Sequence, residues 1–234
     1  MPTYYGFLTN SYQGRARMAD TIVKFSSSDS CIGLIVRGKL SAQHHPGAMA
    51  QHADVILADG SPVGFYGEGN GGNSNSVGLG MQGVVYDHAA LRIQRPYYID
   101  VSSAVSNRVV STVLLVKVTS DQANKFAKSW ASMTTDPGNF NILGGNCSTH
   151  ASASFIDAGL LKRGIPGLDT PDNLYAQLVK ELPATSLQSL SGYIGFQVEP
   201  GGGFSLALKP YIDTVSVNRP NPGKSGALSV KSSV

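Results

Sequence analysis

Charged residues and cysteines are scarce in this sequence. Asp, Glu, Lys and Arg make up 14% of its 234 residues, and it has two cysteines, Cys31 and Cys147. Two cysteines allow one disulfide at most, which excludes a small domain held together mainly by disulfides. The 18 Lys and Arg residues, against 15 Asp and Glu, are scattered rather than gathered into a patch. We therefore expect no nucleic-acid partner, because proteins that bind nucleic acids usually concentrate their basic residues.

Long apolar runs are missing as well. No stretch approaches the roughly 18 consecutive apolar residues that a membrane-spanning helix requires. The first twenty residues also lack the basic segment followed by an apolar segment that marks a secretory signal. We therefore expect no membrane span and no cleavable signal. The protein then either stays in the cytoplasm or is secreted by machinery that reads no such signal.

The remaining composition is that of a folded protein with many loops. Hydrophobic residues make up 41% of the chain and 27 residues are Gly, which is enough apolar material for one core connected by many turns. We predict a single domain with an N-terminal arm and strands over 1–50, a core with a closing hairpin over 51–217, and a flexible tail over 218–234.

The hydrophobic pattern predicts an α+β fold with a mainly antiparallel sheet. The expected strands cover 21–25, 31–36, 53–58, 62–67, 91–101, 109–118, 193–199 and 204–209, and a Gly- and Asn-rich loop covers 67–83. Three helices are expected before the closing hairpin, and cap residues mark where they begin: Thr119, Asn146 or Cys147, and Thr170.

Cys147 carries the clearest chemical signal. The segment GGNCSTHASASFIDAGL places its thiol after two glycines and in the first turn of an amphipathic helix. The amide groups and the dipole of a helix N-terminus stabilise an anion, so a thiol there can react as a nucleophilic thiolate, and nearby N–H groups can receive an oxyanion. The alternative is a small buried residue that fits the base of the helix.

A nucleophilic thiol of this kind needs a base, and the chain has five histidines. His52 opens an apolar strand, where its ring can emerge at the end of a sheet facing the N-terminus of a helix, and it is our first choice. His150 shares the helix of Cys147, which holds its ring beside the helix rather than toward a substrate. The other three are expected to be surface or structural residues: His44, His45 and His88.

Two acidic residues are candidates to orient His52. The Asp-Gly pair at 59–60 predicts a hairpin whose second strand returns beside His52. A three-residue turn places Glu68 directly opposite His52 and on its face, whereas a two-residue turn places Gly67 there and turns Glu68 away. Glu68 is our first choice. Asp54 lies on the face of His52 in either register and is the fallback.

Other chemistries have little support in the sequence. The candidate ligands of a zinc site are His44, His45, His52 and Cys147. Their spacing matches no common zinc pattern, and the chain has no HExxH or CxxC motif. The GxSxG elbow of serine hydrolases and the GxxxxGK[ST] phosphate loop are also missing. We therefore expect no metal and no other cofactor.

The order of these motifs resembles that of the circularly permuted NlpC-type papain-like cysteine hydrolases. The resembling segments are QHADVILADGSPVGFYGEG with His52, the helix in VTSDQANKFAKSW, FNILGGNCSTHASASFIDAGL with Cys147, and TPDNLYAQL. They cover about residues 50–182, and the histidine strand precedes the cysteine helix as in that group. Two features depart from its pattern, namely His150 on the cysteine helix and the length of the loop after Glu68.

This resemblance implies a papain-like catalytic core over 51–217, in which an antiparallel sheet packs against the helix of the nucleophile Cys147, with His52 as base and Glu68 as the third residue. It implies a cysteine hydrolase that cleaves amide bonds, with peptidoglycan peptides as the expected substrate. Several members without a signal are antibacterial effectors delivered by type VI secretion, which implies secretion machinery and an immunity protein as partners and the periplasm of a target cell as destination. The alternatives are a deamidase, acyltransferase or lipid hydrolase toxin acting on a protein or lipid, and a non-catalytic binding protein.

Overall fold

The described part of the molecule is built around one antiparallel sheet. The structure is a computed structural model of the chain, and it describes residues 20–25, 30–47, 51–68 and 81–211. Within these residues the strands are β1 (Thr21–Lys24), β2 (Cys31–Arg37), β3 (His52–Ile56), β4 (Pro62–Gly67), β5 (Met81–Tyr86), β6 (Ser111–Lys117), β7 (Asn139–Phe140), β8 (Leu187–Val198) and β9 (Phe204–Pro210). Their order across the sheet is β1-β9-β8-β6-β2-β3-β4-β5-β7, and every ladder is antiparallel.

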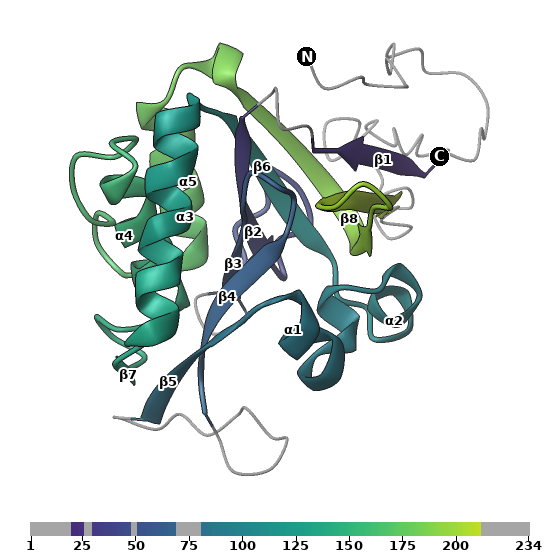
Figure 1. Cartoon of the computed structure of the whole chain (residues 1–234), viewed down its shortest axis with the longest axis horizontal. Coiled ribbons are helices and arrows are strands. Elements are labelled where there is room, and N and C mark those ends of the chain that lie inside the picture. Colours follow the sequence, from purple (N-terminus) through teal and green to yellow (C-terminus); the bar gives the residue numbers. More distant parts are fainter. Residues whose placement is uncertain (1–19, 26–29, 48–50, 69–80, 212–234) are drawn as a thin grey trace, which may run out of the picture.

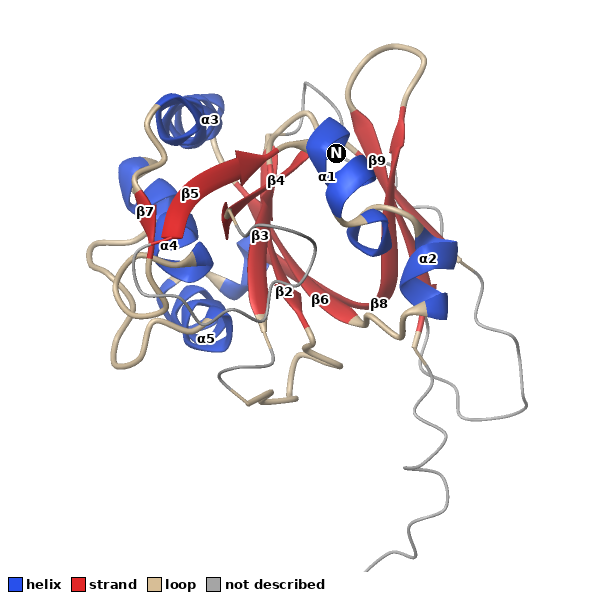
Figure 2. Cartoon of the chain, turned by 90° about the horizontal axis from the view of Figure 1, so that it is seen from below, coloured by secondary structure: helices blue, strands red, loops and turns tan. Residues whose placement is uncertain are grey.

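Helices cover both faces of this sheet. The helices are α1 (His88–Gln94), the 3-10 helix η2 (Pro96–Tyr98), α2 (Val101–Ser106), α3 (Ser120–Thr135), α4 (Cys147–Asp157), α5 (Pro171–Glu181) and the 3-10 helix η3 (Ala184–Ser186). Figures 1 and 2 show α3, α4 and α5 on one side of the sheet and α1 and α2 on the other. Because successive strand residues point to opposite faces, Leu114 of β6 packs in the core under α3–α5 and Leu115 packs in the core under α1. The α+β class with an antiparallel sheet is therefore confirmed.

The three helices predicted from caps are present. Thr119 and Asn146 each form a capping box at the start of α3 and α4, and the Thr170 side chain accepts from the N–H of Asn173 at the start of α5. The strand at 109–118 is β6, and the closing hairpin is β8 with β9. The N-terminal strands β1 and β2 pair with β9 and with β3 and β6, so they share one sheet with the core strands.

The strand predicted at 91–101 is wrong, because this segment forms α1, η2 and the start of α2. Its apolar residues alternate as in a strand, yet two aspartates cap helices there. The Asp87 carboxylate accepts from the N–H of Ala90, and the Asp100 carboxylate accepts from the N–H of Ser103. Local side-chain caps of this kind favour helical turns over an extended chain.

Part of the predicted loop at 67–83 is also strand, since β5 begins at Met81 and pairs with β4 and β7. The rest of that loop, the arm up to residue 19 and the predicted tail lie outside the described residues. None of the described helices is both long enough and apolar enough to cross a lipid bilayer.

Aromatic packing holds α4 against the sheet. Phe155 is fully buried, and its ring lies 4.9 Å from that of Phe126 on α3. Trp130 of α3 donates its indole N–H to the Ser154 hydroxyl over 3.0 Å. On its other side α4 packs on β3 and β4. The N-terminus of α4 therefore sits at a fixed place beside the first residues of β3.

Candidate active site

Asn146 fixes the first turn of α4 and with it the position of Cys147. Its side-chain oxygen accepts from the N–H groups of Ser148 and Thr149 over 2.9 and 3.1 Å. Its side-chain N–H₂ donates to the carbonyl oxygens of Ile142 and Asp169 over 2.9 and 3.0 Å. One amide thus joins the loop before α4 to the loop before α5.

The sulfur of Cys147 lies at the point where β3 and β4 stop pairing. The ladder between these strands runs from Ile56 to the pair Asp54–Gly64. Leu57 donates its N–H across the hairpin to Ser61, so alternation directs the N–H of Ala53 toward β4 as well. Ala53 lies one residue past the last pair, and its N–H donates to Cys147 Sγ over 3.4 Å.

This opening lets residues from the two faces of the sheet meet. Ala53 belongs to the core under α3–α5 together with Cys147, whereas Ile56 belongs to the opposite core. By alternation His52 and Asp54 lie on the face of Ile56. Where the two strands stop pairing, the Cys147 side chain lies close enough to the His52 ring to raise the pKa of that ring.

His52 lies between a carboxylate and the thiol. Its Nε2 bonds to Asp54 Oδ1 over 2.8 Å. Its side chain is 15% exposed. Burial lowers the pKa of His52, but the charges of Cys147 and Asp54 and their hydrogen bonds outweigh burial and raise this pKa from 6.5 to about 9. The imidazole is therefore protonated at neutral pH.

Asp54 is the residue that orients His52. Its side chain is fully buried, and burial raises its pKa, but the positive charges of His52 and Arg37 hold the pKa of this carboxyl well below its usual range. Arg37 approaches Oδ2 with Nε and Nη2 at 2.8 Å each, and the Tyr66 hydroxyl donates to Oδ1 over 2.6 Å. A buried carboxylate with this many partners stays ionised and keeps one orientation.

Glu68 does not occupy the position that we predicted for it. The observed turn is Ala58-Asp59-Gly60, closed by Leu57 and Ser61, and this register places Tyr66 opposite His52. Both predicted registers are therefore wrong. Glu68 lies two residues further along, is exposed, and donates its backbone N–H to the carbonyl oxygen of Gln82. The fallback Asp54 stands beside His52 instead.

The sequence held a signal for the observed turn. Gly60 has φ of 84°, the left-handed conformation that favours glycine. A three-residue hairpin loop commonly ends on a residue of this conformation. Placing Gly60 last in the turn, rather than in its middle, gives the observed register.

The other histidines serve packing and polar contacts. The His150 ring stacks on Phe65 with centroids 3.5 Å apart, its Nδ1 bonds to the carbonyl oxygen of Asn146, and burial lowers its pKa. The His88 ring lies 4.8 Å from that of Phe204. No disulfide joins the two cysteines, and Cys31 packs against the core on the other face from Cys147.

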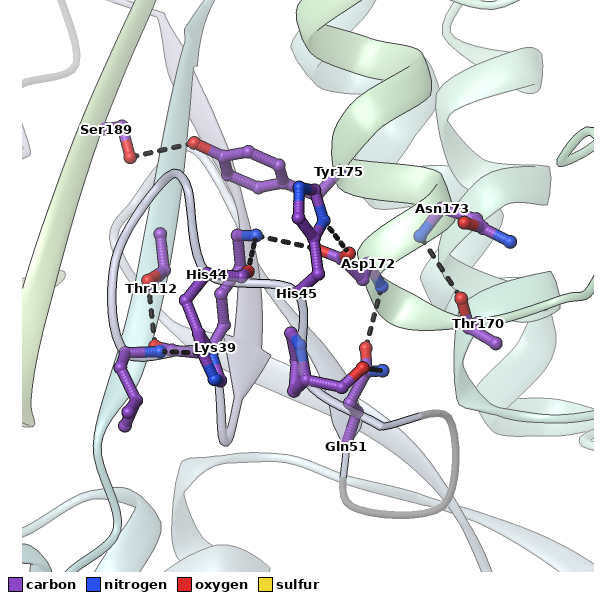
Figure 3. A network of polar contacts seen from close by, with 12 residues as sticks. Lys39, His44, His45, Gln51, Thr112, Thr170, Asp172, Asn173, Tyr175 and Ser189 are labelled. Atoms are coloured by element: carbon purple, nitrogen blue, oxygen red, sulfur yellow. Dashed lines mark hydrogen bonds and ion pairs between the residues drawn. The ribbon is translucent and has the colours of Figure 1, made fainter. Parts of the chain in front are cut away.

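His44 and His45 belong to a polar network that ties the start of β3 to α5 (Figure 3). The buried Lys39 donates from Nζ to Asp172 Oδ1 over 2.6 Å and to the carbonyl oxygen of His44. His45 bonds from Nδ1 to the second oxygen of Asp172 over 2.7 Å. The Asp172 N–H donates to Gln51 Oε1 over 2.8 Å. Gln51 directly precedes His52, so this network fixes the chain that leads into the site.

The described residues contain no group of three or more His, Cys, Asp or Glu side chains arranged to hold a metal ion. Comparisons with protein-family models, with curated protein sequences and with solved structures found no match to this chain. The site is therefore interpreted from its own geometry. In that geometry His52 can accept a proton from the Cys147 thiol, and Asp54 can stabilise the resulting imidazolium and fix the orientation of its ring.

The raised pKa of His52 makes protein stability depend on pH. Because the folded state binds this proton more tightly than the unfolded state, its contribution is complete below pH 6.5 and is lost as the pH rises through about 9. We expect the His52 ring resonances of the folded wild type to titrate with a midpoint at about pH 9 in an NMR experiment. A midpoint near 6.5 would show that His52 has an ordinary pKa.

Gly64 leaves the space that the Asp54 carboxylate occupies. A Cβ at this position would overlap Asp54 Oδ1 and come within 3.0 Å of Tyr66 Cε2. We expect Gly64→Ala to displace the carboxylate, to lower the pKa of His52 in an NMR titration, and to cost about 1–3 kcal/mol of stability. The control is Gly164→Ala, where a Cβ meets nothing within 4 Å. An unchanged His52 titration in Gly64→Ala would contradict the assignment of Asp54.

Proposed function

We propose that this protein is a cysteine hydrolase with Cys147 as nucleophile, His52 as general base and acid, and Asp54 as the residue that orients His52. The observation that carries the proposal is the position of the His52 ring between the Cys147 thiol and the buried Asp54 carboxylate. Enzymes that catalyse covalent acyl transfer use this arrangement: a nucleophile, a base within hydrogen-bond reach, and a third group that orients the base.

The first half of the reaction forms an acyl-enzyme. His52 Nδ1 holds the proton of the Cys147 thiol, and the thiolate attacks the carbonyl carbon of an amide. As the C–N bond breaks, His52 donates this proton to the departing amine, which leaves a thioester and a neutral imidazole. Asp54 accepts from Nε2 throughout, so Nδ1 keeps facing the reacting atoms.

The second half restores the enzyme. Neutral His52 takes a proton from water as the water oxygen attacks the thioester carbonyl. The C–S bond then breaks, the carboxylic acid product departs, and the Cys147 thiolate again faces the His52 imidazolium. The Ala53 N–H, which donates to the sulfur, stabilises the thiolate in both halves.

The backbone N–H of Cys147 is the proposed donor to the oxyanion. The side chain of Asn146 engages the N–H groups of Ser148 and Thr149. The N–H of Cys147 lies in the same first turn of α4, next to the sulfur, where the helix dipole also favours negative charge.

The proposed substrate is an amide bond in peptidoglycan peptides. This part of the proposal rests on the motif order, which resembles that of permuted NlpC-type papain-like hydrolases, and it includes their papain-like arrangement of sheet and cysteine helix. Delivery by a secretion system into the periplasm of a target cell, with a cognate immunity protein, belongs to the same proposal.

Purified peptidoglycan sacculi provide the test. We expect wild type to release soluble muropeptides with new amino groups, and Cys147→Ala to lower the rate by at least about 1,000-fold, because removal of a nucleophile leaves only binding and oxyanion stabilisation. Cys31→Ala is the matched control and keeps the wild-type rate. Release of muropeptides by Cys147→Ala at the wild-type rate would contradict the proposed nucleophile, and no release by wild type would contradict the proposed substrate.

A further inference from the structure

Two tyrosine rings stack on the imidazole of His52. The Tyr66 centroid is 4.3 Å from that of His52 with 24° between the ring planes, and the Tyr98 centroid is 5.8 Å away with 11° between the planes. Tyr66 comes from β4 and Tyr98 from η2. Aromatic faces carry partial negative charge, so they favour the protonated form of a ring that lies over them.

Tyr66 also contacts the partner of His52. Its hydroxyl donates to Asp54 Oδ1 over 2.6 Å, and the same oxygen accepts from His52 Nε2 over 2.8 Å. The Tyr66 ring therefore stacks on His52, while the Tyr66 hydroxyl hydrogen-bonds to Asp54. Burial and the nearby Asp54 charge raise the pKa of Tyr66 well above its usual value, so the hydroxyl remains a donor.

Tyr66 is itself held in place. Its side chain is 3% exposed, and the Tyr86 ring stacks on it with centroids 4.8 Å apart. The guanidinium of Arg95 lies 4.8 Å from its ring centroid. Side chains fixed on several sides lose little rotamer freedom when they orient a neighbour.

We infer that Tyr66 is a positioning residue of this site: its hydroxyl fixes the Asp54 carboxylate, its ring fixes the plane of His52, and together they direct Nδ1 of His52 toward Cys147. The inference rests on the proposed function, because it assigns a role in activating the same thiol. Other charged or titratable groups around His52 are Cys147 on α4, Arg37 on β2 and Tyr98 on η2.

Alkylation of Cys147 by iodoacetate measures this role without a known substrate. The reagent is an anion, so its reaction is fast while His52 is protonated and slows as the imidazolium loses its proton. The midpoint of that decline reports the apparent pKa of the pair. Peptide mapping by mass spectrometry separates labelling of Cys147 from labelling of Cys31, and circular dichroism restricts the comparison to folded protein.

Two variants of Tyr66 separate the functions of its hydroxyl and its ring. We expect Tyr66→Phe, which keeps the ring, to react about tenfold more slowly at neutral pH. We expect Tyr66→Leu, which removes the ring, to shift the midpoint about half a unit to one unit lower as well. Tyr86→Phe is the matched control, because Tyr86 stacks on Tyr66 but lies one strand further from His52, and it keeps the wild-type rate and midpoint.

The outcomes distinguish the inference from the function on which it rests. Wild-type Cys147 that reacts no faster than N-acetylcysteine overturns the proposed function. A reactive wild type with Tyr66→Phe indistinguishable from Tyr86→Phe overturns the inference alone. Should Tyr66→Leu fail to fold, the rate of Tyr66→Phe decides, since that variant retains the shape of the buried ring.

Discussion

The site depends on the point at which β3 and β4 separate. A strand sends successive side chains to opposite faces, so His52 lies on the face of Ile56, whereas Ala53 packs in the other core together with Cys147. A continuous ladder would occupy the N–H of Ala53 and keep the thiol away from the imidazole. Because pairing ends at Asp54, this N–H turns to the Cys147 sulfur and the helix N-terminus enters the opening. A local defect in the sheet is therefore what allows the candidate nucleophile and base to meet.

The buried charges around this opening balance one another. Arg37 and protonated His52 are positive and Asp54 is negative, and in the proposed site the thiolate of Cys147 supplies the second negative charge. A buried carboxylate is costly unless charges and donors surround it. Here the oxygens of Asp54 receive the Arg37 guanidinium, the His52 ring and the Tyr66 hydroxyl. Each partner also has a structural role: Arg37 lies over the Tyr98 ring, and the Tyr66 ring stacks on His52. Orientation and charge balance thus come from the same contacts.

The sequence was sufficient for the parts of the site that local patterns encode. Two short-range signals were enough to find them. Cys147 directly follows the helix cap Asn146, and His52 is the first residue of an apolar strand. The prediction of Glu68 as the third residue is wrong because it puts Gly60 in the middle of the three-residue turn. With Gly60 last in the turn, the register moves by two residues, which keeps the face but replaces Glu68 by Tyr66 beside His52. The strand prediction at 91–101 is wrong because Asp87 and Asp100 cap the helices α1 and α2, and these local caps outweigh the apolar alternation of the segment. The contact of Lys39 with Asp172 joins residues 133 positions apart. Such a pairing is fixed by the tertiary fold and leaves no local signal.

In the proposed site, the Cys147 side chain and the protonated His52 ring form one buried pair. An NMR titration of the His52 ring in wild type and in Cys147→Ser tests it most directly, with Cys31→Ser as control. We expect a pKa of about 9 for His52 in wild type and in the control. We expect a clear fall of this pKa in Cys147→Ser, because the neutral hydroxyl removes a negative charge that stabilises the imidazolium. The same His52 pKa in all three proteins would show that the two side chains do not meet.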